Sequence, residues 1–167
     1  MLEVVDSCCV QCGRALDQHD RQVRFRLPDP VLSAFGGALP DDAWLDAPDP
    51  SVAVMMQVPR LGAFVRVLAP IPLSGGFSVT FGAWLGVHPD DLQRAFRVWH
   101  APAYADLDLD GRLANDLLDR GVLGAPARAT VLNVLHTPYV TTSTDERLVE
   151  LLRGPSDHDD VLSHLPA

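Results

Sequence analysis

Residues 64–87 constrain the fold of this chain more than any other segment. Two apolar runs, 64–73 and 77–87, flank the sequence Ser74-Gly75-Gly76. Because adjacent glycines tolerate the positive φ angles of a tight turn, this segment predicts a β-hairpin. His88-Pro89-Asp90-Asp91 follows at once and predicts the start of a helix, with proline at the first helical position and carboxylates in the first turn. A hairpin joined directly to a helix is typical of the α+β class.

Further strands follow from local patterns. Strict alternation of polar and apolar residues predicts a strand at 22–27. Runs of apolar and β-branched residues predict strands at 51–58 and 126–140, the latter with its core at 128–135. Pro70 and Pro72 cannot donate hydrogen bonds to a neighbouring strand, so the first arm of the hairpin is expected to lie at an edge or to be bulged there.

Helices are expected after three of these segments. A short helical turn is predicted at 31–35, and the helix that begins at Pro89 has apolar residues at helical spacing up to Trp99. Ser143 and Glu146 have the spacing of a capping box, which predicts a helix that ends before Gly154. Ser156 is expected to cap a last short helix.

Together these elements predict one domain over residues 1–167. We expect a single antiparallel sheet of about five strands, with two or three helices packed on one face. The helices that begin at Pro89 and Ser143 are expected to cover the side of the sheet that carries Trp84. Trp44 lies in a Pro- and Asp-rich loop at 40–50 and is expected to pin this loop to the core.

The charge of the chain limits its partners. The net charge is −9 and all thirteen basic residues are arginine. Phosphate neutralisation needs a basic stripe, so nucleic acid is not expected as a partner. The acidic residues concentrate at 41–49 and 143–167. These segments predict either a solvated surface or a docking face for a basic protein partner.

The N-terminus and the cysteines indicate the compartment. Residues 1–6 lack the basic and apolar regions of a signal peptide. No apolar run approaches the roughly 18 residues that a membrane span needs. Three cysteines within five positions do not form a secreted disulfide framework. We therefore expect a cytoplasmic protein that does not associate with a membrane.

The N-terminal cysteines are the candidate metal ligands. Cys9 and Cys12, followed by glycine, have the spacing of one zinc knuckle. Cys8 and His19 complete a possible set of four ligands, although adjacent cysteines bind one ion with difficulty. A distant histidine (His88, His100 or His136) is the alternative fourth ligand. The other interpretations are a redox dithiol, whose thioredoxin-like context is missing, and cysteines in a turn without chemistry of their own.

The segment 106–111 resembles the first half of a calcium-binding loop. Asp106, Asp108 and Asp110 alternate with leucines and a glycine follows, but the closing glutamate is replaced by Leu117. The same alternation is typical of a strand with an acidic outer face. The strand is the ordinary interpretation.

No nucleophile with a neighbouring base and no phosphate-binding loop is recognisable along the sequence. An enzyme site assembled from distant residues, such as Asp108, Asn115 and His136, remains open because catalytic groups converge in space. His158 is expected to lie exposed in the acidic C-terminal segment. Trp84 is expected in the core, with a stacking platform for a ligand as the alternative.

Several motifs resemble one family across nearly the whole chain. They are Cys9-x-x-Cys12-Gly13, Pro28-Asp29-Pro30, Phe64-Val65-Arg66 with Ile71-Pro72-Leu73, Phe81-Gly82-Ala83-Trp84-Leu85-x-Val87, Tyr104 with Gly111-Arg112-Leu113-Ala114-Asn115, and Pro138 with Ser143-Thr144-Asp145 and Leu148. In order and spacing they resemble the bacterial domain-of-unknown-function 2199 family. This resemblance implies a cytosolic bacterial protein with a knuckle-like N-terminus and no assigned reaction. Family members place a histidine three residues after the glycine, where this chain has Leu16, and this departure disfavours a metal site.

Three functions are therefore expected as alternatives. The first is a small acidic binding or accessory module without catalysis, which docks a basic protein partner. The second is a domain stabilised by structural zinc at Cys9, Cys12, His19 and Cys8. The third is an enzyme whose site is assembled from distant residues.

Overall fold

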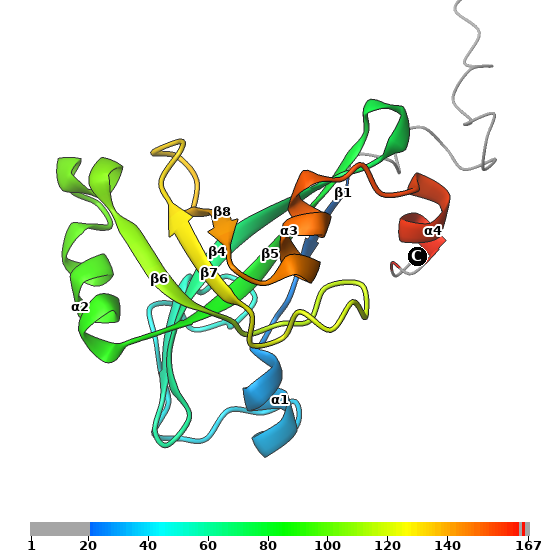
Figure 1. Ribbon diagram of the computed structural model, residues 1–167. Helices are drawn as coiled ribbons and strands as arrows, with labels where there is room; N and C mark the ends of the chain where they lie inside the picture. The colour runs from blue at the N-terminus through cyan, green and yellow to red at the C-terminus, as the bar shows by residue number, and fades with distance from the viewer. Residues whose placement is uncertain (1–20, 164, 166–167) are drawn as a thin grey trace, which may run out of the picture.

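The computed structural model describes residues 21–163 and residue 165. It contains eight strands: β1 (Arg21–Arg24), β2 (Trp44–Leu45), β3 (Met55–Val58), β4 (Gly62–Pro72), β5 (Ser78–Val87), β6 (Asp108–Leu113), β7 (Pro126–Thr130) and β8 (Tyr139–Ser143). The four α-helices within the described range are α1 (Asp29–Phe35), α2 (Pro89–Val98), α3 (Glu146–Arg153) and α4 (His158–Ser163). Figure 1 shows their arrangement around the long hairpin of β4 and β5.

Five of the strands form a closed mixed barrel. Antiparallel pairs join β4 to β5, β5 to β6, β6 to β7 and β7 to β8. A parallel bridge between Leu68 of β4 and Tyr139 of β8 closes the ring. Outside the ring, β1 pairs in parallel with β5, while β3 and then β2 extend antiparallel from β4.

The expectation of a single antiparallel sheet of about five strands with helices on one face is therefore wrong. Local alternation identifies strands but carries no information on which distant strands pair. The closing bridge joins residues 68 and 139. A register shift between Arg128 and Ala129, where β7 pairs with β8, adds the local irregularity that lets a strand bend.

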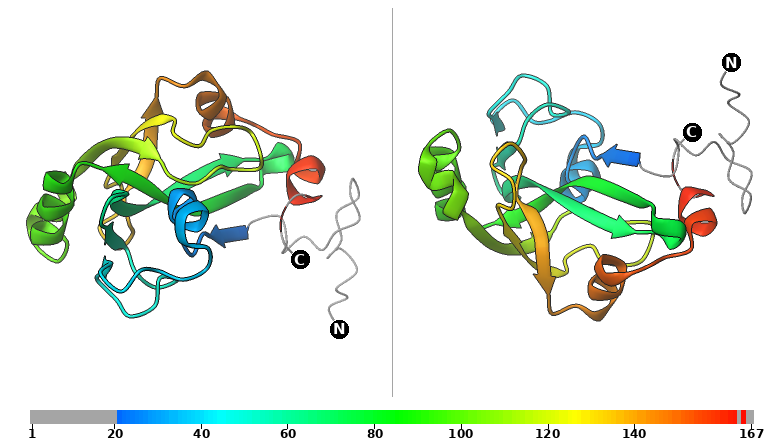
Figure 2. Two further views of the ribbon diagram at one scale, coloured as in Figure 1. Left: turned by 90° about the horizontal axis from the view of Figure 1, so that it is seen from below. Right: turned by 90° about the horizontal axis from the view of Figure 1, so that it is seen from above.

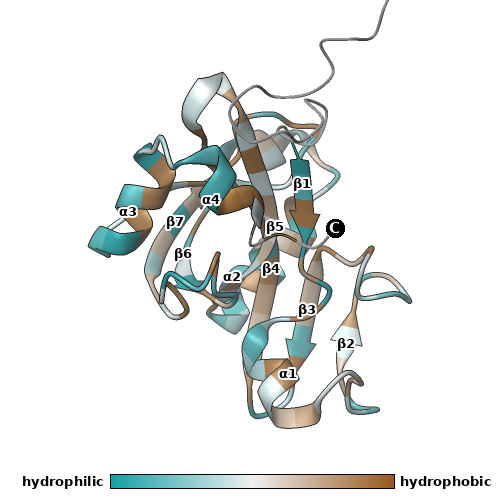
Figure 3. Ribbon diagram, turned by 90° about the vertical axis from the view of Figure 1, so that its right-hand side faces the viewer, coloured by the Kyte–Doolittle hydropathy of each residue, from teal (hydrophilic) through white to brown (hydrophobic). Residues whose placement is uncertain are grey.

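The β4–β5 hairpin forms the centre of the molecule, as expected. Its register runs from Ala63 opposite Val87 to Pro72 opposite Ser78. Gly75 and Gly76 in the turn both have positive φ angles, which glycine adopts without strain. The hydropathy colouring shows that both strands are largely apolar along their length (Figure 3), because both of their faces are packed. β4 is thus an interior strand rather than an edge.

Pro70 and Pro72 fit into this interior strand for a geometric reason. Both pair with β5, opposite Thr80 and Ser78. On its other side, β4 pairs with β8 at Leu68 and not beyond it. The prolines therefore lie where no further strand requires a backbone donor.

Two hydrophobic cores lie on the two sides of this hairpin. The larger core contains interior residues of the barrel together with buried residues of α2 and α3, such as Leu92 and Leu148. The smaller core consists of Leu27, Val31, Ala53, Met56, Val58, Phe64, Trp84 and Ala114. In both views of Figure 2 the hairpin runs between α3 and the segment that precedes β3. The expectation that α2 and α3 cover the Trp84 side is therefore wrong, because Trp84 packs with α1.

The structure confirms the predicted start of α2, but the predicted capping residues of α3 and α4 are wrong. His88 caps α2 by accepting a hydrogen bond from the Asp90 N–H at 3.1 Å. The cap of α3 is Asp145 rather than Ser143, because the Asp145 carboxylate accepts from two backbone N–H groups of the first turn. Ser156 pairs with Leu73 instead of capping α4.

The segment 126–140 is the other clear difference. It was expected to be one long strand, but β7 ends at Thr130 and β8 begins at Tyr139. Residues 131–138 between them form a connection that we call the apolar loop. The predicted strand at 51–58 is likewise shorter, since residues before Met55 form a turn.

Candidate functional site

The apolar loop exposes three large aliphatic side chains. Leu132 is 66% exposed, Val134 is 62% exposed and Leu135 is 87% exposed. The loop projects beyond the ends of β7 and β8 (Figure 1, gold). Isolated exposed leucines are ordinary, whereas several on one short loop are typical of an interaction site.

Hydrogen bonds within the loop fix its shape. The Leu135 N–H donates to the side-chain oxygen of Asn133 at 2.9 Å. The His136 N–H donates to the carbonyl of the same Asn133 at 3.0 Å. The His136 Nδ1 lies 2.8 Å from the Tyr139 hydroxyl. The tip is thus an ordered turn.

Neighbouring segments hold both ends of the loop. The Val131 N–H donates to the Leu107 carbonyl at 3.3 Å, and the Leu68 N–H of β4 donates to the Pro138 carbonyl at 2.8 Å. The Tyr104 hydroxyl donates to the His136 carbonyl. These contacts attach the loop to the barrel on two sides.

Tyr104 comes from a 3₁₀ turn, η4 (Pro102–Asp106), that packs beside the loop. Its ring packs against Trp99, with centroids 4.9 Å apart. Burial raises the pKa of Tyr104 to about 12. The hydroxyl therefore keeps its proton, and with it the bond to the loop, throughout the physiological pH range.

Carboxylates lie at the base of the loop. Asp106 directly precedes Leu107, is exposed, and forms no side-chain hydrogen bond or ion pair with the part of the chain that the structure describes. Asp108 pairs with Thr130 in the β6–β7 ladder and forms an ion pair with Arg128. An apolar tip with an acidic border is the resulting surface.

The three residues expected for an assembled enzyme site do not converge. Asp108 and His136 lie near the end of the barrel that carries the apolar loop, whereas Asn115 follows β6 at its other end. The six residues of β6 span about 17 Å. Asn115 is fully buried, and its side chain accepts from the Trp84 N–H at 2.8 Å and donates to Leu27 and Asp29. Asn115 therefore connects structural segments.

The fold does bring one serine and one histidine together, which the sequence did not indicate. The Ser74 Oγ lies 2.8 Å from the His158 Nδ1, and the His158 N–H donates to the same Oγ at 3.0 Å. His158 is 2% exposed, so its expected exposure is wrong. The residues are 84 positions apart, which no local pattern bridges.

The geometry of this pair favours a structural role. The His158 Nδ1 also lies 3.1 Å from the Ser74 carbonyl, which can only accept a hydrogen bond. A protonated Nδ1 satisfies both neighbours, and in that tautomer this nitrogen cannot take a proton from the serine. His158 also packs edge-on against Phe77. The pair thus attaches α4 to the tip of the central hairpin.

A second apolar surface lies beside α2. Trp44 and Phe96 pack edge to face, with centroids 5.7 Å apart, and help line a groove of about 300 Å³. Trp44 is 40% exposed. It therefore does not pin its loop into the core as expected, and it packs on a helix residue that is itself exposed.

The candidate zinc ligands Cys8, Cys9, Cys12 and His19 lie outside the described residues. Within residues 21–163 and 165, no group of three or more His, Cys, Asp or Glu side chains is placed to hold a metal ion. His88 and His136 both take part in hydrogen bonds. The zinc interpretation stays a prediction about the N-terminal segment.

Two of the three candidate calcium residues belong to a strand, as the ordinary interpretation expected, whereas Asp106 ends the 3₁₀ turn η4 that precedes it. Asp108 and Asp110 belong to β6, whose burial alternates around the buried Leu109. The Asp108 carboxylate forms an ion pair with Arg128 instead of facing a metal ion.

None of the helices in the described part of the chain is long and apolar enough to cross a membrane. Comparison with protein-family models, with curated proteins and with solved structures finds no match for this chain. The resemblance to the domain-of-unknown-function 2199 family therefore stays a prediction.

Proposed function

We propose that this chain is a protein-binding module without catalysis, and that the apolar loop inserts into an apolar cleft of a basic partner protein. The exposure of Leu132, Val134 and Leu135 on one ordered loop is the observation that carries this proposal. Basic side chains around the cleft of the partner would face Asp106 at the base of the loop.

Burial of the loop supplies the driving force. Complete burial of an exposed leucine or valine side chain contributes about 1.5–3 kcal/mol. Three such side chains supply about 4.5–9 kcal/mol, which is of the same order as the cost of lost translational and rotational freedom, so the contacts around the loop must supply the remainder. A small central group of apolar side chains commonly dominates the energy of an interface.

The order of the loop reduces the cost of binding. Asn133 fixes the turn, and Tyr104 holds its far end to the barrel. A loop that already has its bound shape loses less conformational entropy when it associates. This distinguishes the apolar loop from a flexible segment that merely contains leucines.

The charge of the module favours a basic partner. The chain carries a net charge of −9, and the exposed carboxylate of Asp106 lies beside the loop. Complementary charges around an apolar centre increase the association rate and exclude wrong partners. Added salt is therefore expected to slow association more than it accelerates dissociation.

Several acidic residues outside this surface have local structural roles. Asp46 accepts hydrogen bonds from the Val54 and Met55 N–H groups at 2.9 and 3.0 Å. Asp160 pairs with Arg120. Because these carboxylates already bind groups of this chain, they are less suited to contact a partner protein than the exposed Asp106 beside the apolar loop.

Quantitative affinity capture tests the proposal. The wild-type chain, the variant Leu132→Ser/Val134→Ser/Leu135→Ser and the control Val52→Ser are each used as bait in extracts of the cells that naturally produce the protein. Val52 is 65% exposed on a different loop and is a matched apolar control. We expect one basic protein that the wild-type and control baits retain and the triple variant loses. Equal recovery on all three baits would refute the proposal.

A further inference from the structure

The apolar loop alone is smaller than a specific interface. Such an interface buries about 800 Å² on each partner, which three aliphatic side chains cannot supply. A partner that binds the loop must therefore also contact the surface beside it. The contacts of Tyr104 lead from the loop to that surface.

A line of aromatic residues connects the apolar loop with the groove beside α2. The Tyr104 hydroxyl donates to the His136 carbonyl of the loop, and the Tyr104 ring packs against Trp99. Phe96 precedes Trp99 by about one helical turn and packs edge to face on Trp44. In both views of Figure 2 the apolar loop lies on the half of the molecule that carries α2. Loop and groove therefore belong to one continuous surface.

The groove beside α2 is built from one buried and two exposed apolar side chains. Leu92 is buried, whereas Phe96 is 57% exposed. Leu45 packs against the smaller core, so the neighbouring Trp44 points to the opposite face of β2, toward α2. The complete lining consists of Trp44, Gln57, Leu92, Gln93, Phe96 and Arg97. Its volume of about 300 Å³ is sufficient for one large apolar side chain of a partner.

Carboxylates border this groove as they border the loop. Asp41 and Asp42 are exposed in the turn that precedes Trp44, and neither side chain forms a hydrogen bond or ion pair with the residues that the structure describes. Arg97 is the one cationic residue of the lining, and its exposed, flexible stem allows the charge to turn to solvent. With Asp106 at the base of the loop, the surface is therefore complementary to basic side chains at both ends.

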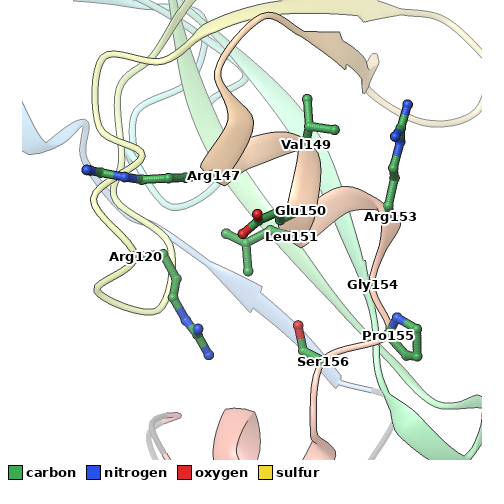
Figure 4. Close-up of a pocket in the computed structure, with 9 residues that line it drawn as sticks. All are labelled: Arg120, Arg147, Val149, Glu150, Leu151, Arg153, Gly154, Pro155 and Ser156. Carbon is green, nitrogen blue, oxygen red and sulfur yellow. The ribbon is translucent and has the colours of Figure 1, made fainter.

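The larger cavity beside α3, of about 600 Å³, is not part of this surface. The strand β8 separates α3 from the apolar loop. Figure 4 shows that Arg147 and Arg153 point away from each other, and Arg120 is paired with Asp160. The charged side chains of this cavity therefore do not converge on a ligand.

We propose that the basic partner of the apolar loop also inserts one large apolar side chain into the groove between Trp44 and Phe96. This inference rests on the proposed function and adds a second contact to it. Apolar side chains that fill pockets commonly act as the anchors of an interface. Two such anchors fix the orientation of the partner, and the surface between them brings the buried area closer to that of a specific interface.

Site-specific photo-crosslinking in the cells that naturally produce the protein tests this inference. The substitutions Leu135→p-benzoylphenylalanine, Phe96→p-benzoylphenylalanine and Phe35→p-benzoylphenylalanine place one reactive group on the loop, on the groove and on a control surface. Phe35 is the matched control, because it is 41% exposed on α1, which packs on the smaller core. We expect the same basic protein to be crosslinked from positions 135 and 96 and not from position 35.

The affinity for this protein, once it is purified, gives a second measurement. Phe96→Ser should weaken binding about tenfold or more, whereas Phe35→Ser should leave the affinity unchanged. Both phenylalanines are exposed, so neither substitution removes a core contact. Equal affinities of the two variants would overturn the inference.

The outcomes at the three positions separate this inference from the proposed function. An adduct at position 135 without the same adduct at position 96 would overturn the inference and leave the proposed function intact. No adduct at position 135 would refute the proposed function and, with it, this inference. An adduct with a second copy of this chain at position 96, or the same adduct from position 35, would also overturn the inference.

Discussion

The guanidinium of Arg66 lies over the indole ring of Trp84, with its central carbon 4.0 Å from the ring centroid. The two residues face each other in the β4–β5 register. Arg66 is fully buried, and its donors are satisfied by backbone carbonyls of four residues, namely Phe25, Pro50, Ala53 and Gly82. One side chain thus joins β5, the turn before β3 and the residue that follows β1.

This arrangement predicts a large loss of stability on substitution of Arg66. Burial, followed by the charge of Arg24, lowers the pKa of Arg66 to about 9, so the side chain is still charged at neutral pH. Arg66→Met leaves the carbonyls without donors and should cost about 3–5 kcal/mol of unfolding free energy. Arg66→Lys should recover only part of this loss, because a single ammonium group cannot reproduce the planar fork.

Urea unfolding followed by tryptophan fluorescence measures these differences. Arg97→Met is the control, because an exposed arginine should change the unfolding free energy by no more than about 0.5 kcal/mol. An effect of Arg66→Met as small as that of the control would contradict the structural role of Arg66.

Closure of the barrel predicts that Gly111 cannot be replaced. A Cβ atom at this position would lie 2.2 Å from the Gly86 carbonyl oxygen and 3.0 Å from the Leu85 Cγ. Gly111→Ala therefore requires β5 and β6 to separate, which should cost about 3 kcal/mol or more. At Gly37 an added Cβ meets nothing within 4 Å, so Gly37→Ala is the matched control. Thermal unfolding of both variants compares them, and equal midpoints would argue against the close approach of β5 and β6.

Tyr104 predicts a specific loss of stability at alkaline pH. Burial raises its pKa to about 12 in the folded state, above the value of 10.0 expected for the unfolded chain. Since the unfolded state then loses its proton first, the stabilisation is complete below pH 10 and disappears as the pH rises through 12. At pH 11 the loss should be about 1 kcal/mol relative to pH 9.

The variant Tyr104→Phe isolates this contribution, because it has no hydroxyl to titrate. Urea unfolding at pH 9 and pH 11 should show a smaller decrease for the variant than for the wild type. Equal decreases in the two proteins would show that Tyr104 does not titrate as its burial implies.

Substitution of His158 should loosen the attachment of α4, and Ser74 should not react as a nucleophile. His158→Phe retains the ring contact with Phe77 but removes the hydrogen bonds of Nδ1, and should cost about 1–2 kcal/mol. Limited proteolysis should then cut more rapidly before α4. A fluorophosphonate probe should not label Ser74, and labelling that His158→Phe abolishes would instead identify a nucleophile.

Local signals in the sequence predicted the elements that depend on local chemistry. The hairpin at Gly75 and Gly76 and the start of α2 at Pro89 were both correct, because turn preferences and helix-start preferences act over a few residues. The pairing of β4 with β8 depends on residues 68 and 139, and no local pattern encodes it. The contacts of Arg66 are equally distant, so its burial was not expected.

The apolar loop shows why the candidate site was missed. Residues 131–135 read Val-Leu-Asn-Val-Leu and continue the apolar character of β7, which favoured a strand. In the fold these residues pass the end of the barrel, where no partner strand covers them. A functional surface that must be apolar and exposed therefore resembles a buried strand when only the sequence is considered.

Site-specific photo-crosslinking tests the proposed binding surface most directly. The substitutions Leu135→p-benzoylphenylalanine and Val52→p-benzoylphenylalanine place the same reactive group on the apolar loop and on the control loop. Irradiation in the cells that naturally produce the protein should give one discrete adduct with a basic protein from position 135 and none from position 52. No adduct at position 135, an adduct with a second copy of this chain, or the same adduct from both positions would contradict the proposed function.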